Sequence, residues 1–334
     1  MPGKKRGIPP ALALFLLSPA VGELLSGSAP PAEFFTPFGF TIMALLYGGG
    51  ALVARELKVR WGRGMGSLLL LGAAYGILEE GMMVASFFSP HWPDLGVLGV
   101  FGRWMGVNWV WAVELTAYHA FVSITVPVIL VEIAYPEAKA EPWLRGIWGR
   151  LVPLLLAGDV AFGFLLFGIL QSYWPPAPQY LLMAALAIAL TALARRLPPD
   201  WARKGERPMR GPRYYWLVSA LAAFGCGLVF WVLPNLLDFP MAPLLVILAG
   251  VLVVWGVVRL IISHDWRQSR PSHRLALAAG ALTPLMVSAL FQEFDKSRLD
   301  DTTGMALVGL ASIAGLLLLK RRIDRLEAEE RPLT

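Results

Sequence analysis

The sequence contains very little cysteine and little charge. Cys226 is the single cysteine among 334 residues, so a disulfide framework and a cysteine-based metal site are both excluded. Charged residues make up only 16% of the chain, whereas hydrophobic residues make up 57%. Apolar runs recur from end to end, with no long soluble domain between them. This composition predicts an all-α, polytopic membrane protein with a single transmembrane domain over residues 1–334.

Apolar windows of about 20 residues, the length that crosses a bilayer, predict about ten transmembrane helices. They lie near residues 10–26, 34–54, 64–88, 107–134, 151–171, 178–194, 214–234, 241–263, 275–293 and 305–319, and a tail follows at 320–334. The first span also resembles a secretory signal peptide, because Lys4 to Arg6 precede a short apolar core. Glu23 and the Ser18-Pro19 break favour a retained, bent helix instead.

The distribution of lysine and arginine predicts the orientation of the chain. If the N-terminus is cytoplasmic, 26 of the 29 basic residues fall in cytoplasmic segments, and only Arg103, Lys296 and Arg298 fall outside. Basic residues accumulate on the cytoplasmic side of short membrane loops. We therefore expect both termini and the tail to be cytoplasmic and the protein to lie in the cell membrane.

The same basic loops indicate which large partners to expect. The stretch RRLPPDWARKGERPMRGPR, within residues 195–213, joins two predicted spans and contains one aromatic residue and two acids. We expect it to contact the anionic headgroups of the lipid bilayer and not nucleic acid.

Two adjacent acids, Glu79 and Glu80, lie within an otherwise uncharged stretch from Gly64 to Phe88. A carboxylate near the middle of a membrane helix costs on the order of 3 kcal/mol, so such acids usually face the protein interior and serve a function. Two neighbouring carboxylates in a low dielectric cannot both ionise cheaply, so at least one is expected to hold a proton near neutrality. The pair therefore predicts a proton-holding site at the centre of the bundle.

Other polar residues concentrate in the first half of the chain. The span at 107–134 contains His119 near its middle, at a depth similar to that of the acid pair, because consecutive spans are antiparallel. The candidate ion or substrate pathway consists of Glu79, Glu80, Glu114, His119, Asp159, Glu23, Thr116, Ser123 and Arg103. Residues 1–171 thus form a polar half that contains the site, and residues 178–319 form a more apolar half.

Two further features concern the outer loop and a glycine run. Residues 89–106 are unusually apolar for an external loop, so they form either a simple interfacial loop or a re-entrant lid. Arg103 in this loop is expected to attract an anion or to pair with Glu114. The run from Gly48 to Gly50 predicts a close helix crossing or an unwound segment.

The acid pair and the histidine also carry a family resemblance. ILEEGMMV around Glu79 and Glu80, followed 39 residues later by YHAFVS around His119, resembles the motifs of the CPBP (Abi, CAAX-protease-like) intramembrane proteases. The resemblance covers about two helices, and it departs from the family because Val84 replaces the motif arginine and a second intramembrane histidine is absent. It implies that Glu79 or Glu80 is the catalytic base and that His119 stabilises the oxyanion.

Three functions are open from the sequence. The first is proton- or cation-linked transport of a small solute, with Glu79 and Glu80 as the carrier acids. The second is a glutamate-type intramembrane peptidase that acts on a membrane peptide. The third is a structural or accessory subunit, whose acids are satisfied by the hydroxyls of Tyr75, Thr116 and Tyr118. No cofactor is predicted, and no metal, because three scattered ligands on two helices do not by themselves define a metal site.

Overall fold

The computed structural model describes residues 8–201, 205–296 and 298–329, and these residues are almost entirely helical. The elements are α1 (Pro10–Pro19), η1 (Ala20–Leu24), α2 (Pro31–Phe34), α3 (Pro37–Met43), η2 (Ala44–Gly48), α4 (Gly49–Arg60), α5 (Met65–Gly76), η3 (Ile77–Met83), η4 (Pro93–Gly99), β1 (Arg103–Trp104), β2 (Val107–Asn108), α6 (Trp109–Tyr118), η5 (His119–Thr125), α7 (Val126–Ala134), η6 (Pro136–Ala138), α8 (Trp148–Leu170), α9 (Ala177–Arg196), α10 (Pro212–Gly227), η7 (Leu228–Val232), η8 (Leu233–Asn235), α11 (Ala242–Ile262), η9 (Trp266–Gln268), α12 (Pro271–Gln292) and α13 (Met305–Glu329). The predicted all-α class is confirmed.

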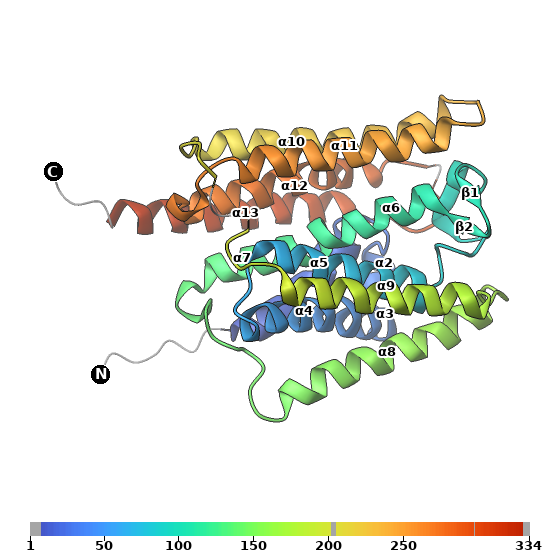
Figure 1. The fold of residues 1–334 in the computed structure, drawn as a ribbon, viewed down its shortest axis with the longest axis horizontal. Coiled ribbons are helices and arrows are strands. Elements are labelled where there is room, and N and C mark those ends of the chain that lie inside the picture. Colours follow the sequence, from blue (N-terminus) through green and yellow to red (C-terminus); the bar gives the residue numbers. More distant parts are fainter. Residues whose placement is uncertain (1–7, 202–204, 297, 330–334) are drawn as a thin grey trace.

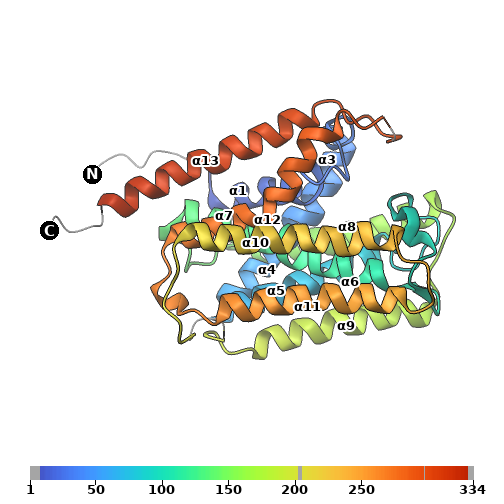
Figure 2. The same ribbon diagram turned by 90° about the horizontal axis from the view of Figure 1, so that it is seen from above.

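The helices form two groups that lie side by side. Helices α10 to α13 pack on one another along one side of the molecule, and α1 to α9 form the larger group (Figure 1). The two groups meet where α12 packs on α7 and where α11 packs on α6. Seen from above, α13 diverges from the other helices at its C-terminal end (Figure 2). The chain therefore does not divide into two matching five-helix halves.

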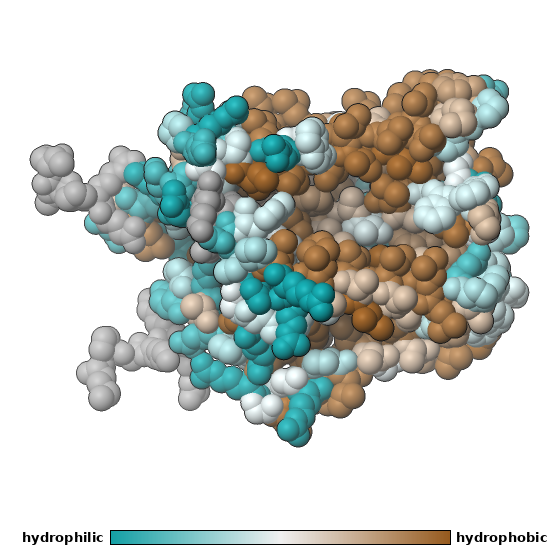
Figure 3. Space-filling view, in the orientation of Figure 1, coloured by the Kyte–Doolittle hydropathy of each residue, from teal (hydrophilic) through white to brown (hydrophobic). Residues whose placement is uncertain are grey.

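The surface identifies the molecule as a membrane protein. A hydrophobic belt crosses the middle of the molecule, and hydrophilic residues gather at its two ends (Figure 3). Seven helices of the described residues are long and apolar enough to cross a bilayer. Helices occupy all ten predicted ranges, but three segments are not among these seven: Pro10–Leu24, Met65–Met83, which carries the two acids, and α13. A multi-pass helical membrane protein is thus confirmed, while the count of ten spans and the cytoplasmic termini stay predictions.

Loops that are predicted to lie on the same side of the membrane contact one another. At the basic end, Arg60 donates to the carbonyl of Leu144 at 2.8 Å. At the opposite end, Gln179 donates to the carbonyl of Met105 at 3.0 Å, which ties the start of α9 to the β1–β2 hairpin. Residues 320–329 of the predicted tail continue α13 as helix. Residues 330–334 and the predicted cytoplasmic segment from Lys4 to Arg6 lie outside the described residues.

Short π-helical turns interrupt four long helices of the larger group: η1 follows α1, η2 joins α3 to α4, η3 follows α5, and η5 joins α6 to α7. Proline accounts for part of this pattern, because it has no N–H to donate to the carbonyl four residues earlier. Pro127 leaves the carbonyl of Ser123 available, and that carbonyl accepts the hydroxyl of Ser18 at 2.9 Å. π turns are rare and frequently occur at functional sites.

The glycine run marks the close crossing that the sequence predicts. A Cβ atom at Gly48 would lie 2.3 Å from the backbone oxygen of Phe15 on α1, and one at Gly50 would lie 2.2 Å from the ring of Tyr75 on α5. At Gly49 the nearest atom, on Leu156, would be at an ordinary 3.6 Å. Two of the three glycines are therefore required for close packing, one against α1 and one against α5.

A buried charge cluster holds the basic end of the larger group together. Arg55 is fully buried and donates to the carbonyls of Lys139 and Glu141, each at 2.7 Å. Glu132 lies 2.5 Å from Lys58 and 3.4 Å from Arg55. Buried ions are tolerated only when they are paired and hydrogen-bonded, and this cluster meets both conditions. These side chains thus anchor the loop between α7 and α8 to α4. The sequence did not predict this role, because Arg55 and Lys58 fall in a segment that was expected to be a basic loop.

Candidate functional site

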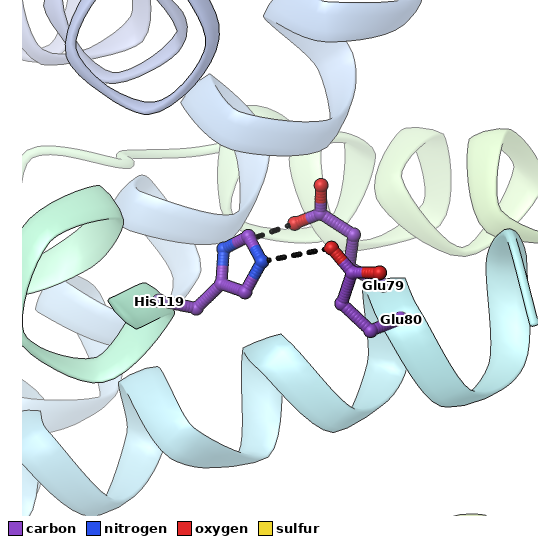
Figure 4. A group of neighbouring side chains, drawn as sticks. All are labelled: Glu79, Glu80 and His119. Carbon is purple, nitrogen blue, oxygen red and sulfur yellow. Dashed lines mark hydrogen bonds and ion pairs between the residues drawn. The ribbon is translucent and has the colours of Figure 1, made fainter. Parts of the chain in front are cut away.

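The acid pair and the histidine meet in the interior of the larger group. Glu79 and Glu80 lie on η3 and His119 is the first residue of η5, and all three are buried. Nε2 of His119 lies 3.1 Å from Oε1 of Glu80, and Nδ1 lies 3.4 Å from Oε2 of Glu79 (Figure 4). The predicted common depth of the two spans is confirmed as direct contact. One imidazole ring thus lies between two carboxyl groups.

A chain of hydrogen bonds fixes the orientation of His119. The indole of Trp111 can only donate, and it donates to Oγ of Ser86 at 3.0 Å. Ser86 in turn donates its hydroxyl to Oε2 of Glu80. With Glu80 ionised, Oε1 of Glu80 accepts from Nε2 of His119, and a neutral ring then carries its N–H on Nε2. Nδ1 is left to exchange a proton with Glu79.

The backbone after η3 brings Ser86 to this position. Ala85 has a φ of 55°, in the left-handed region that side chains other than glycine rarely adopt. The turn reverses the chain, so that Ser86, six residues after Glu80, reaches back to its carboxylate. Such strained residues cost about 1–3 kcal/mol and persist where the surrounding structure imposes them, often at functional sites.

Three tyrosines surround the imidazole. The rings of Tyr47, Tyr75 and Tyr118 lie 6.0, 5.8 and 5.5 Å from that of His119. The hydroxyl of Tyr75 lies beside Glu79 and has no well-formed hydrogen bond among the described residues. Oε2 of Glu79 and Nδ1 of His119 are likewise without one. These three buried polar atoms adjoin one another at Glu79, where Oε2 lies 3.4 Å from Nδ1 of His119.

A fourth ionisable residue, Glu23, adjoins this centre. Glu23 lies on η1 and accepts the hydroxyl of Tyr47, which lies on η2. Each of the four π turns in the larger group therefore contributes a side chain to the site or to its border. The predicted first-half location of the chemical centre agrees with this arrangement.

Other predicted pathway residues occupy different positions. Asp159 is buried on α8, which packs against η3, and its Oδ2 atom has no partner among the described residues. Ser123 lies four residues beyond His119, and its hydroxyl is also unpaired there. Thr116 lies on α6, and its backbone carbonyl accepts from the backbone N–H of His119. The structural alternative requires the hydroxyl of Tyr118 to hydrogen-bond to one of the acids. In the structure this hydroxyl donates to the carbonyl of Gly22 at 3.0 Å.

The expected pair between Arg103 and Glu114 is wrong. Arg103 donates instead to the carbonyls of Phe88 and Ser89, at 2.8 and 3.0 Å, because the β1–β2 hairpin places its guanidinium against the end of the turn that follows η3. Glu114 accepts the indole N–H of Trp231 on η7. Both residues therefore serve packing between elements and do not reach His119.

Sequence reasoning did not single out Tyr47, Ser86 and Trp111. Ser86 lies outside any regular helical spacing from Glu80, since a π turn and a left-handed residue separate them. Trp111 lies near the predicted outer end of its span, where a tryptophan is ordinarily an interfacial anchor. Tyr47, next to the triple glycine, had a usable signal, because a glycine run allows a bulky neighbour to approach closely.

The same three residues offer ligand atoms for a cation. Among the described residues, Glu79, Glu80 and His119 form a group whose ligand atoms lie within 4.8 Å of one another. Both imidazole nitrogens, however, face carboxylate oxygens, and only one nitrogen of a ring can bind a given ion. The arrangement matches a hydrogen-bonded proton relay more closely than a ligand set.

Comparison with known proteins gives one match. Residues 12–325 match a family model described as an uncharacterized membrane protein family, so the chain belongs to that family. No curated protein matches the chain, and no solved structure does. The family match supports a membrane protein but adds no support for the resemblance to CPBP proteases.

Proposed function

We propose that this protein is a glutamate-type intramembrane hydrolase that cleaves a membrane-embedded peptide. The observation that carries the proposal is the directed chain from Trp111 through Ser86 and Glu80 to His119, which leaves Nδ1 and Glu79 as the proton-exchanging pair. In hydrolases, an acid that orients a histidine fixes its tautomer, and a base within hydrogen-bond reach activates the nucleophile.

In this proposal Glu79 is the general base. Both oxygens of Glu80 already accept hydrogen bonds, whereas Oε2 of Glu79 is free of a well-formed one. Glu79 takes one proton from a water molecule as the water oxygen forms a bond to the carbonyl carbon of the peptide. The same proton then passes to the leaving nitrogen as the C–N bond breaks, so the products are a carboxylic acid and an amine.

The oxyanion partner is Tyr75 in this proposal. The resemblance to CPBP proteases implies that His119 has this role, but both nitrogens of His119 face carboxylates. The Tyr75 hydroxyl is buried, lies beside Glu79 and has an O–H available to donate. A preorganised donor of this kind contributes about 10²- to 10³-fold to the rate.

The test uses purified protein in nanodiscs with a library of fluorogenic membrane peptides. We expect cleavage by the wild type, a loss of about 10²- to 10⁴-fold in Glu79→Gln, and a loss of about 10²- to 10³-fold in Tyr75→Phe. Glu114→Gln is the matched control, since Glu114 is a half-buried acid on the neighbouring helix α6 that bonds to Trp231 away from the site. No cleavage by the wild type, or equal rates in Glu79→Gln and Glu114→Gln, would reject the proposal.

Proton-linked transport of a small solute is the second candidate. It is favoured by further buried hydroxyls in the same group of helices, on Ser67, Ser123 and Thr125, which have no hydrogen-bond partner among the described residues. Against it, the site lies within one group of helices and not between two matching halves. Solute-driven proton uptake into liposomes that is lost in both Glu79→Gln and Glu80→Gln would support transport over hydrolysis.

A further inference from the structure

A groove lies between α6 and α11, and its lining includes none of Glu79, Glu80 and His119. It has a volume of about 450 Å³, and its walls are apolar except for one charged residue. Val113 and Ala117 of α6 face Val254 and Val258 of α11 across it. Both helices are long and apolar enough to cross a bilayer, so the groove lies within the membrane region.

The length of the groove matches one leaflet. Its lining on α11 runs from Gly250 to Ile262, and twelve residues of helix rise about 18 Å. Half of a hydrocarbon core of about 30 Å is about 15 Å. A single acyl chain of ordinary length therefore fits along α11 from the middle of the membrane to its surface.

The charged residue lies at the surface end of the groove. Arg259 is exposed in the last turn of α11 and forms no ion pair among the described residues. Its guanidinium lies 5.9 Å from the ring of Trp255, which is 60% exposed. Trp201, from the loop after α9, completes this end of the lining. Tryptophan and arginine at such a position are typical of the headgroup level of a membrane.

We propose that this groove binds one anionic phospholipid, with an acyl chain between α6 and α11 and the phosphate on Arg259. Charge complementarity selects the headgroup, because an unpaired arginine between membrane helices attracts a lipid phosphate and favours a lipid of net negative charge. The leaflet is the one at the basic end of the molecule. The proposal is independent of the chemistry at His119.

The test is native mass spectrometry of the full protein released from nanodiscs made with equal parts of phosphatidylglycerol and phosphatidylcholine that have identical acyl chains. We expect the wild type to retain one phosphatidylglycerol, at about five times the occupancy of phosphatidylcholine. Arg259→Gln should remove this preference, and Arg259→Lys should keep most of it. Arg196→Gln is the matched control, because Arg196 is an exposed arginine at the same end of the lipid-facing helix α9.

A substitution that fills the groove provides a second test of the proposal. Ala117→Phe should lower the occupancy of both lipids, because the ring blocks the space for the acyl chain. Equal retention of the two lipids by the wild type would overturn the proposal. So would a phosphatidylglycerol preference that survives Arg259→Gln, or one that Arg196→Gln removes equally. If Ala117→Phe does not fold, the comparison of Arg259→Gln with Arg259→Lys still decides the question.

Discussion

Glu80→Gln should reverse the tautomer of His119. The glutamine side chain has the same size as glutamate but only one oxygen, and the hydroxyl of Ser86 already donates to this position. If the amide oxygen keeps the Ser86 bond, the amide NH₂ faces Nε2 of His119, which lies 3.1 Å away in the wild type. Nε2 must then accept, and the N–H moves to Nδ1, opposite Glu79.

We expect Glu80→Gln to lower the activity strongly and to affect folding much less. All four groups of the chain keep a hydrogen-bond partner in Glu80→Gln, so we expect the protein to be produced and to remain monodisperse. The N–H at Nδ1 then donates to Oε2 of Glu79, so this oxygen is no longer free to act as the base in the proposed mechanism. Misplaced tautomers of this kind lower turnover by about 10²- to 10⁴-fold, which corresponds to about 3–5 kcal/mol in the barrier.

The assay is nitrogen-15 NMR of histidine-labelled protein, which distinguishes ring nitrogens that bear a proton from those that do not. The chain has four histidines, so the signals of His119 are assigned by their loss in His119→Gln. The neutral ring should bear its proton on Nε2 in the wild type and on Nδ1 in Glu80→Gln. An unchanged tautomer, or full activity with the reversed one, would refute the reasoning.

Three further substitutions test the packing around the site and the charge cluster at the basic end. Gly50→Ala should displace the ring of Tyr75, because the new Cβ would lie 2.2 Å from that ring, and it should lower peptide cleavage about 10²-fold. The adjacent Gly49→Ala should stay active. Equal activity of the two variants would contradict this prediction. Ser86→Ala should leave a buried indole N–H unpaired and lower the free energy of unfolding by about 1–3 kcal/mol, measured by denaturant titration in detergent. Arg55→Met should leave the carbonyls of Lys139 and Glu141 without their donor and Glu132 paired only with Lys58 among the described residues, and so lower this free energy by about 1–3 kcal/mol. A variant as stable as the wild type would show that Arg55 is not needed in the charge cluster.

The sequence was sufficient to predict the membrane class and the common depth of the three central residues. Long apolar runs identify membrane helices by length alone. Consecutive antiparallel spans bring Glu79, Glu80 and His119 to one depth, and the structure shows them in contact. These predictions depended only on helix rise and on the cost of burying charge, and both apply to any sequence.

The detailed contacts could not be predicted, because the helices are not regular at the site. Regular spacing places successive side chains about 100° apart, but the π turn of η3 allows Glu79 and Glu80 to reach opposite nitrogens of one ring. The reversal at Ala85 that brings in Ser86 has no signature, since alanine rarely adopts a positive φ. Tertiary contacts impose both departures.

Hydrolysis at Glu79 is the central claim, and the incorporation of oxygen-18 tests it most directly. Wild-type protein and Glu79→Gln are incubated with the membrane peptide library in oxygen-18 water, and the products are analysed by mass spectrometry. The account predicts new C-terminal carboxyl groups that carry the label with the wild type and essentially none with Glu79→Gln. Absence of labelled termini with the wild type, or equal labelling with Glu79→Gln, would contradict it.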